Sequence, residues 1–342
     1  MKDIFSYNTT SLSKELKLSG IDGYRAKQLF AGFFSGKDLN ELYLDKKTKD
    51  YINENYTHNF ITLEEKQVSK DKTQKYLFKL NDNNFIEAVL MKYKHGYSLC
   101  ISTQVGCNMQ CTFCASGINK LTRNLTVGEM VSQVVYINNL LGGGLGEKRK
   151  ISSIVLMGIG EPLDNYKNVK NFIESVTDND YLNFSRRSIT LSTCGIIKKI
   201  KDLADDALGI TLTVSLHSAL DEIRKNLMPI AKLYTVNELL HACDYYYNKT
   251  NRRVTFEYIL IEDITVSKKQ GDQLVKLFKN RPHHINLINM NPIKESELKP
   301  VKAKEAIDFK SYLESRGLNV TLRRTLGKDI DGACGQLRKK HR

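Results

Sequence analysis

The spacing of apolar residues changes twice along this chain, and each change predicts a different kind of structure. In residues 1–65 apolar positions recur every three or four residues, most clearly between Tyr24 and Phe34, which is the spacing of an amphipathic helix. Turns that contain glycine separate these stretches. We expect residues 1–65 to form a small N-terminal helical domain.

Residues 66–104 instead alternate apolar and polar side chains, which is the period of a β-strand. Two such stretches, 75–80 and 85–91, flank the sequence Asn-Asp-Asn-Asn at 81–84, and asparagine and aspartate favour tight turns. The pattern predicts a β-hairpin and then a further strand over residues 97–102. We expect residues 66–104 to be a β-strand extension that leads into the main domain.

From residue 105 to residue 342 strand-like and helix-like segments alternate. A helical pattern at 127–141 precedes a strand pattern at 151–157, and further strands are predicted at 188–192, 210–216, 253–260, 284–288 and 318–323. Such alternation is typical of parallel strands connected by helices. The strands number about six, fewer than the eight of a closed TIM barrel. We therefore predict an α/β fold with a partial (β/α)6 barrel of the TIM type over residues 105–342.

Composition narrows the class of protein further. Hydrophobic residues make up 41% of the chain, but no apolar run approaches the ~18 residues of a membrane span. The first residues, Met-Lys-Asp-Ile-Phe-Ser, lack the apolar segment of a signal peptide. The 7 cysteines are an odd number, and three of them are too close together for a disulfide scaffold. We expect a monomeric protein of the reducing cytoplasm with no membrane partner.

The charge distribution suggests a polyanionic partner. The formal net charge is +14, and residues 1–65 hold 9 Lys and Arg against 10 Asp and Glu, so the positive excess lies in residues 66–342. Basic side chains that neutralise phosphates release condensed counterions. The 17 tyrosines and 13 phenylalanines supply rings on which an unstacked base could lie. A basic surface that serves only solubility is the alternative interpretation.

Three cysteines carry the most specific chemical signal. Cys107, Cys111 and Cys114 have the spacing C-x3-C-x2-C. Electron-carrier [4Fe–4S] clusters use four cysteine ligands, whereas three thiolates leave one iron open to a chelating small molecule. A structural zinc site is the alternative, because Cys111 and Cys114 alone form a half-site. Zinc needs four protein ligands, however, and the sequence offers no second pair at the usual spacing.

Four short polar motifs follow predicted strands of the main domain. They are Gly158–Pro162, Ser192–Gly195, Ser215–His217 and Asn289–Pro292. The carboxyl ends of parallel strands lie on one rim of the fold, where active sites gather. We expect the four motifs to converge on a single site.

With these motifs the chain resembles the RlmN/Cfr family of radical S-adenosylmethionine (SAM) RNA methyltransferases along nearly its whole length. The resemblance is carried by residues 100–114, 157–163, 215–217 and 329–337. One departure is Gly332, where the family often has alanine, another small residue. The resemblance implies a radical SAM barrel that uses a [4Fe–4S] cluster on Cys107, Cys111 and Cys114 and two SAM molecules per turnover.

The resemblance also implies roles for three residues outside the cluster motif. Cys334 would take a methyl group from one SAM, and a 5′-deoxyadenosyl radical from the second SAM would remove a hydrogen from that methyl. The resulting methylene radical would add to an adenine carbon. Glu87 would then remove the proton from that carbon, and Cys100 would form a disulfide with Cys334 to release the product. From the residues alone, Cys100 could be a packed core cysteine and Glu87 an exposed strand position.

The family pattern assigns SAM binding to seven positions: Gly160, Glu161, Ser192, Ser215, Leu216, His217 and Asn291. On the sequence alone, His217 could be a structural histidine and Asn291 could cap a turn before Pro292. Cys194 and Cys243 match no functional position, and we interpret both as structural.

The implied reaction is methylation of C2 of an adenine in 23S rRNA, with an adenine of the tRNA anticodon loop as a second substrate. Residues 161–163 and 191–194 resemble the C2-directed branch more than the C8-directed antibiotic-resistance branch, which is the alternative. A second alternative is an iron–sulfur RNA-binding redox sensor without catalysis. The resemblance further implies an electron donor such as flavodoxin or ferredoxin, and an accessory RNA-binding role for residues 1–65.

Overall fold

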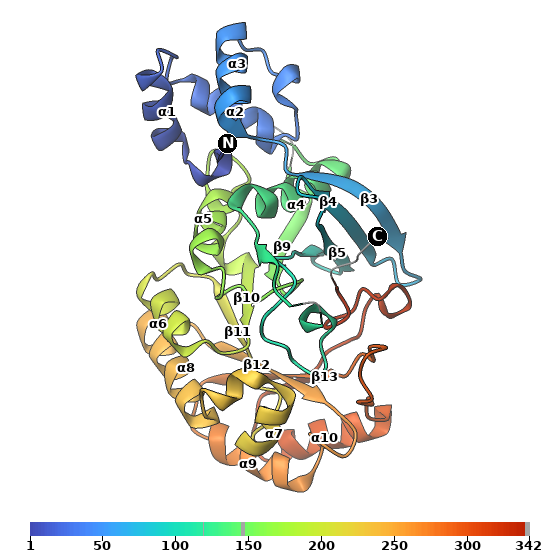
Figure 1. The fold of residues 1–342 in the computed structure, drawn as a ribbon. Coiled ribbons are helices and arrows are strands. Elements are labelled where there is room, and N and C mark those ends of the chain that lie inside the picture. The colour runs from blue at the N-terminus through green and yellow to red at the C-terminus, as the bar shows by residue number, and fades with distance from the viewer. Residues whose placement is uncertain (119, 145–147, 339–342) are drawn as a thin grey trace.

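A computed structural model describes residues 1–118, 120–144 and 148–338 of the chain (Figure 1). Residues 339–342, the end of the predicted main domain, lie outside the described residues. Near the N-terminus lie β1 (Lys2–Asp3), α1 (Thr9–Leu18), α2 (Arg25–Phe34), α3 (Lys46–Asn55) and β2 (Tyr56–Thr57). Within the described residues, no helix combines the length and apolar character needed to cross a membrane.

The N-terminal helices share one hydrophobic core with the rest of the protein. Phe5 packs against the rings of Phe34 and Phe60 at centroid distances of 5.2 and 5.9 Å. Phe34 in turn stacks on Tyr181 at 4.7 Å. A Cβ atom on Gly128 would lie 2.2 Å from the ring of Phe60, so only glycine allows this close approach. Aromatic packing thus fixes the helices on the barrel.

The main sheet has ten strands within the described residues, in the order β14-β13-β12-β11-β10-β9-β6-β5-β4-β3. The strands from β6 to β14 are parallel, and β3 to β6 pair antiparallel. Their bounds are β3 (Ile61–Val68), β4 (Gln74–Leu80), β5 (Phe85–Tyr93), β6 (Gly96–Cys100), β9 (Ile151–Leu156), β10 (Ile189–Thr193), β11 (Thr211–Ser215), β12 (Val254–Leu260), β13 (His283–Asn289) and β14 (Val320–Leu322).

Helices follow the parallel strands and cover the outside of the curved sheet (Figure 1). They are α4 (Val127–Leu140), α5 (Tyr166–Thr177), α6 (Ile197–Asp205), α7 (Asp221–Leu227), α8 (Val236–Thr250), α9 (Lys268–Phe278) and α10 (Ala303–Ser315). Capping boxes start α4, through Thr126 and Glu129, and α8, through Thr235 and Glu238. The arrangement confirms the predicted α/β partial barrel, in which six strand–helix units from β6 to α10 precede the short edge strand β14.

The antiparallel extension begins earlier than its predicted start. Strand β3 starts at Ile61, inside the segment that the sequence predicted to be helical up to residue 65. Its residues alternate between half-buried and exposed, because β3 is the edge of the sheet. Edge strands often carry charged residues, and the charges at 64–66 hide the apolar alternation in the sequence.

The β3–β4 hairpin holds the C-terminal segment in place. Ser69 Oγ donates to Asp329 Oδ1 at 2.5 Å, and the Lys70 amide donates to Asp329 Oδ2 at 3.1 Å. The Gly327 amide donates to Asp71 Oδ2 at 2.8 Å. These contacts join residues that are more than 250 positions apart and fix the segment that carries Cys334.

We predict that Asp329→Ala loosens this segment without unfolding the barrel, because it removes the two hydrogen bonds that Asp329 accepts from the hairpin. Hydrogen exchange measured by mass spectrometry should become about tenfold faster in residues 327–338, while the melting temperature changes little. Asp308→Ala, at an exposed position on α10, is the matched control. Unchanged exchange in the C-terminal segment of the Asp329 variant would show that other contacts hold it.

Candidate active site

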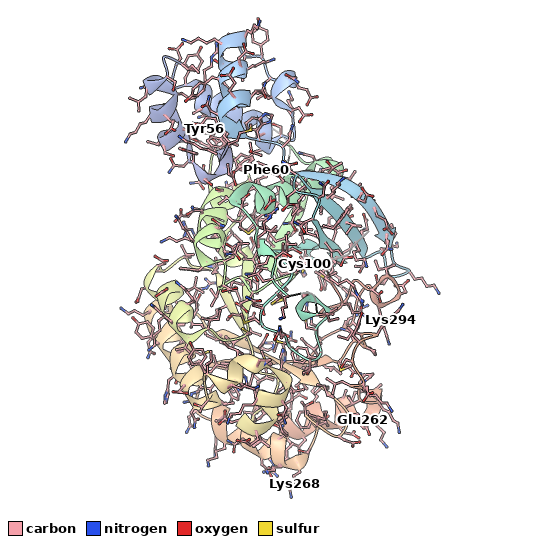
Figure 2. The ribbon with its side chains drawn as sticks, viewed as in Figure 1. Tyr56, Phe60, Cys100, Glu262, Lys268 and Lys294 are labelled. Carbon is pink, nitrogen blue, oxygen red and sulfur yellow. The ribbon has the colours of Figure 1, made fainter. Side chains whose placement is uncertain are left out.

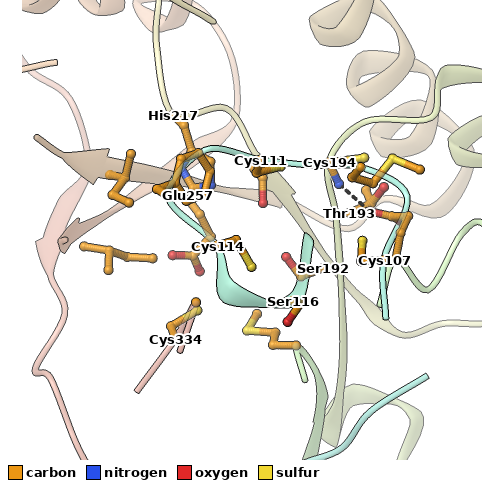
Figure 3. Close-up of a pocket in the computed structure, with 18 of the residues that line it drawn as sticks. Cys107, Cys111, Cys114, Ser116, Ser192, Thr193, Cys194, His217, Glu257 and Cys334 are labelled. Carbon is orange, nitrogen blue, oxygen red and sulfur yellow. Dashed lines mark hydrogen bonds between the residues drawn. The ribbon is translucent and has the colours of Figure 1, made fainter. Parts of the chain in front are cut away.

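A pocket opens at the carboxyl ends of the parallel strands (Figure 3). It brings together the cysteine motif, the four strand-end motifs and the C-terminal loop, which are far apart in the sequence. The predicted site residues that line it are Cys107, Cys111, Cys114, Gly160, Glu161, Ser192, Ser215, His217, Asn291 and Cys334. The expected convergence on one rim is therefore observed.

The cysteine motif forms a loop above the pocket. The short strand β7 (Gln104–Val105) pairs with β8 (Arg123–Asn124) and closes the base of the loop. The Cys114 amide donates to the Cys111 carbonyl at 3.1 Å, which forms a turn between the two residues. Across residues 1–118, 120–144 and 148–338, no group of three His, Cys, Asp or Glu is placed to hold a single metal ion. The three thiols line one shared cavity.

The Gly160–Glu161 motif joins two strand ends. Gly160 has φ +109°, and a Cβ atom there would lie 2.5 Å from Gln104 Cβ, so only glycine fits. Glu161 accepts hydrogen bonds from the amides of Leu163 at 3.0 Å and Cys194 at 2.8 Å. Burial raises the pKa of the Glu161 carboxyl, while the amide donors favour its charged form. The carboxylate thus binds the loop after β9 to the end of β10.

Of the Ser215–His217 motif, two side chains face the pocket and one does not. Ser215 and His217 line it, whereas the Leu216 side chain is buried in the main core. His217 has φ +59°, and its ring meets Phe113 edge-on at 4.8 Å. Burial, with a contribution from Arg224, lowers the pKa of His217 to about 3. The imidazole is therefore neutral, and its buried Nδ1 has no hydrogen-bond partner among the described residues.

Arg224 supports this rim from behind, and the sequence analysis missed it. Its guanidinium donates from Nε to the Leu216 carbonyl at 3.0 Å, and from Nη2 to the carbonyls of Cys194 at 2.8 Å and Ser215 at 3.2 Å. The side chain is fully buried. Its position in α7 looks like an ordinary polar helix position, so periodicity gave no signal. Glu257, which also lines the pocket, was missed because it lies inside an apolar strand.

The C-terminal loop contacts the cysteine loop directly. The Ala115 amide donates to the Gly335 carbonyl at 2.7 Å, and Ser116 Oγ donates to the Leu337 carbonyl at 2.7 Å. Asn291 Nδ2 donates to the Cys334 carbonyl at 3.1 Å. Cys334 is the one exposed cysteine among the described residues, and its exposed surface faces the pocket. Desolvation of the Cys334 thiol within the pocket raises its pKa.

Cys100 and Glu87 lie behind the pocket wall and do not line it. Cys100, labelled in Figure 2, ends β6 in the interior of the molecule and packs with Val89 and Leu337. Burial, followed by the nearby Cys334 thiol, raises the pKa of Cys100 to about 12. Glu87 Oε2 accepts from the Arg338 amide at 2.9 Å, and Glu87 Oε1 lies 3.4 Å from Lys75 Nζ. Both residues therefore contact, or lie beside, the segment that carries Cys334.

The donor set fits the cofactors of the predicted chemistry. Three thiols provide three corners of a [4Fe–4S] cluster, and the cavity beside them has carboxylate, hydroxyl and amide groups from the strand ends. Burial raises the pKa of Cys107 to about 12, so loading of iron displaces thiol protons. Cys107, Cys111 and Cys114, which the sequence predicts to hold the cluster, thus line one cavity with these groups.

Comparisons with a protein-family model and with known sequences agree on one family. Residues 101–269 match the model of the radical SAM superfamily. The chain is 45% identical to a probable dual-specificity RNA methyltransferase RlmN of Clostridium novyi (strain NT), with 100% of this chain and 99% of that protein covered. It is 46% identical to a protein of the same name from Clostridium botulinum (strain Alaska E43 / Type E3), with 100% and 97% covered.

A solved structure agrees over the same length. The crystal structure of a radical SAM methyltransferase from Sphaerobacter thermophilus superposes with a TM-score of 0.93 at 34% identity and covers 98% of this chain and 99% of that one. The match includes the partial barrel, the antiparallel extension and the N-terminal helices, because nearly every residue is covered. The chain therefore belongs to the RlmN-type family of radical SAM RNA methyltransferases.

Proposed function

We propose that this radical SAM RNA methyltransferase methylates C2 of an adenine in 23S rRNA, and an adenine of the tRNA anticodon loop, through a methyl group carried on Cys334. The observation that carries the proposal is the contact between the cysteine loop and the C-terminal loop, in which the Ala115 amide donates to the Gly335 carbonyl at 2.7 Å. It holds the proposed carbon carrier at the same cavity as the cluster ligands.

The family uses a [4Fe–4S] cluster and SAM, two molecules per turnover, which supply a transferable methyl group and a carbon radical when bound. In this chain Cys107, Cys111 and Cys114 would hold the cluster. The SAM-binding role implied for the strand ends suits Gly160, Ser192, Ser215, His217 and Asn291, which line the same cavity. Glu161 also lines the cavity, and its carboxylate could accept hydrogen bonds from SAM. Leu216 would act through its backbone, since its side chain lies in the main core.

A carbon carrier on the protein answers a chemical difficulty. C2 of adenine is electron-poor and has no lone pair with which to attack a sulfonium methyl. A direct polar transfer of the methyl group from SAM to C2 is therefore not feasible. Cys334 would accept the methyl carbon first: its sulfur would bond to that carbon, the bond from the carbon to the SAM sulfur would break with the electron pair left on the SAM sulfur, and the thiol proton would go to solvent. The carried methyl would then lose one hydrogen to the carbon radical and present its carbon to the adenine. The target base must leave its stack to reach the pocket.

Release of the product would use the two residues behind the pocket wall. The adduct formed by the carbon radical would lose one electron to the acceptor that the bound cluster supplies, and Glu87 would accept the proton from the substituted adenine carbon. Cys100 would attack the sulfur of Cys334, which breaks the sulfur–carbon bond and leaves the electron pair on the departing carbon, where a proton is taken up. The contact of Glu87 with the Arg338 amide and the packing of Cys100 against Leu337 support these roles.

RNA and an electron donor are the remaining partners that we propose. The excess of positive charge outside residues 1–65 suits an RNA backbone, and the N-terminal helices would serve as an accessory RNA-binding domain. A small electron-transfer protein such as flavodoxin or ferredoxin would reduce the cluster.

We predict that Cys334→Ala abolishes RNA methylation, because the carbon has no acceptor on the protein. The wild-type protein incubated with SAM should gain the mass of one methyl group on the peptide that contains Cys334. Nucleoside mass spectrometry with authentic standards then distinguishes 2-methyladenosine from 8-methyladenosine. Methylation by the Cys334 variant at the wild-type rate would contradict the proposed carrier.

We predict that Cys100→Ala traps a covalent adduct between Cys334 and the RNA, because the attacking thiol for release is missing. The adduct should appear as a slowly migrating band on a denaturing gel and persist in the presence of reductant. Cys243→Ala, which alters another buried cysteine in α8, should give no such band. Normal turnover of the Cys100 variant without an adduct would exclude its role in release.

We predict that Glu87→Gln lowers turnover at least about 100-fold, the usual range for loss of a general base. Methylation of Cys334 should continue, because that step needs no proton from the adenine. The measurement compares RNA product with the Cys334 methyl peptide in one reaction. If both fall together, Glu87 acts through the fold of the C-terminal segment and not on the substrate.

A further inference from the structure

Lys75 is a buried cation beside the proposed base, and no sequence motif identified it. The side chain of Lys75 is 6% exposed and that of Glu87 is 1% exposed. No other ion pair between described residues has both side chains so completely buried. Lysine is almost never buried to this degree without a charged partner. The pair is therefore an unusual feature of the sheet.

Strands β4 and β5 place the two side chains on one face of the antiparallel extension (Figure 1). In the register of this strand pair, Lys75 lies opposite Val89 and Glu87 lies opposite Leu77. The two charged residues are therefore diagonal neighbours, a separation that a long side chain can span. Lys75 Nζ lies 3.4 Å from Glu87 Oε1. The sheet itself thus brings the ammonium to the carboxylate.

The same ammonium contacts the segment that carries Cys334. Lys75 Nζ donates to the carbonyl of Asp331 at 3.3 Å. Glu87 Oε2 accepts from the Arg338 amide at 2.9 Å, so the ion pair binds this segment on both sides of Cys334. The proposed base and the proposed carbon carrier are therefore connected through Lys75.

The backbone of Glu87 is fixed from the other direction. Ser102 Oγ donates to the Glu87 carbonyl at 2.6 Å and accepts from the Ile159 amide at 3.0 Å. Because the backbone cannot shift freely, the direction of the carboxylate depends on the groups that bind its two oxygens. Lys75 is a charged group at one of them, Oε1.

We propose that Lys75 is the positioning residue of Glu87 in the reaction. The inference rests on the proposed function. A nearby ammonium favours the ionised form of a buried carboxylate, and only the ionised form accepts a proton. The proton moves from the substituted adenine carbon to a Glu87 oxygen, while the electron pair of the carbon–hydrogen bond stays in the adenine ring. Lys75 neither gains nor loses a proton.

A structural role alone accounts poorly for this ion pair. Desolvation of two buried charges offsets most of their attraction, and apolar residues of similar size often stabilise a protein as well. Strands β4 and β5 already pair at six positions, so the sheet does not need the charges. A fixed ammonium beside a base has a chemical use, because a small misplacement of a reacting group slows the reaction strongly.

The test compares two steps of the reaction in the protein loaded with its cluster. Single-turnover reactions with SAM, reductant and an RNA that contains the target adenine are followed by mass spectrometry of the Cys334 peptide and of the methylated nucleoside. K75M should form RNA product at least about tenfold more slowly, because the base is misaligned, whereas methylation of Cys334 should stay within about twofold of wild type. Deuterium at the target carbon should slow K75M more than wild type, because proton removal becomes the slow step.

Three further variants make the result specific. K75R keeps a positive charge and should recover most of the rate of RNA product formation. K79M alters a half-buried lysine of the same strand, which lies opposite Phe85, and should behave like wild type. K75M/E87Q should match E87Q within about twofold, since a residue that acts through Glu87 adds nothing once Glu87 is lost. The double variant leaves neither charge of the pair unpartnered, so it decides the question even if K75M fails to fold.

Two results would overturn the inference. One is formation of RNA product by K75M at the wild-type rate, and the other is a K75M/E87Q protein about tenfold slower than E87Q, which would show an effect of Lys75 that does not pass through Glu87. Failure of the proposed function has a different signature. If E87Q itself methylates RNA at the wild-type rate, the proposed base fails. If E87Q is slow and K75M is not, only the present inference fails.

Discussion

The site of this protein depends on the contact between the C-terminal segment and the cysteine loop, which lie more than 200 residues apart in the sequence. Two hydrogen bonds, from the Ala115 amide to Gly335 and from Ser116 Oγ to Leu337, make the connection at 2.7 Å each. Closing so long a loop carries an entropic cost, and the β3–β4 hairpin offsets it with its contacts to Asp329 and Gly327. The antiparallel extension therefore serves the site although it does not line the pocket.

Around that connection the rim is built from buried charges whose partners are mainly backbone groups. Glu161 accepts from two amides, and Arg224 donates to three carbonyls. A buried charge without partners would be strongly unfavourable. Because the partners are strand-end backbone groups, the charges fix the positions of β9, β10 and β11 relative to one another. Rigid strand ends suit a site that must hold a cofactor in one geometry.

The same segment also separates the two faces of the site. Cys334 and the cluster ligands lie on the pocket side, whereas Cys100 packs against Leu337 and Glu87 binds the Arg338 amide on the other side. One short segment, residues 334–338, thus contains Cys334 and also contacts Cys100 and Glu87.

The sequence by itself determined the fold class and predicted the cluster ligands and the rim motifs, because strand–helix periodicity and the spacing of Cys107, Cys111 and Cys114 are local patterns. The family resemblance supplied the roles of Cys100, Cys334 and Glu87, which no local pattern shows. The tertiary structure alone decided which side chains face the pocket: Leu216 turns into the core, Arg224 and Glu257 become buried at the rim, and Arg323 lines the pocket half-buried. Burial and the pairing of charges depend on neighbours far away in the chain, so sequence spacing could not reveal them.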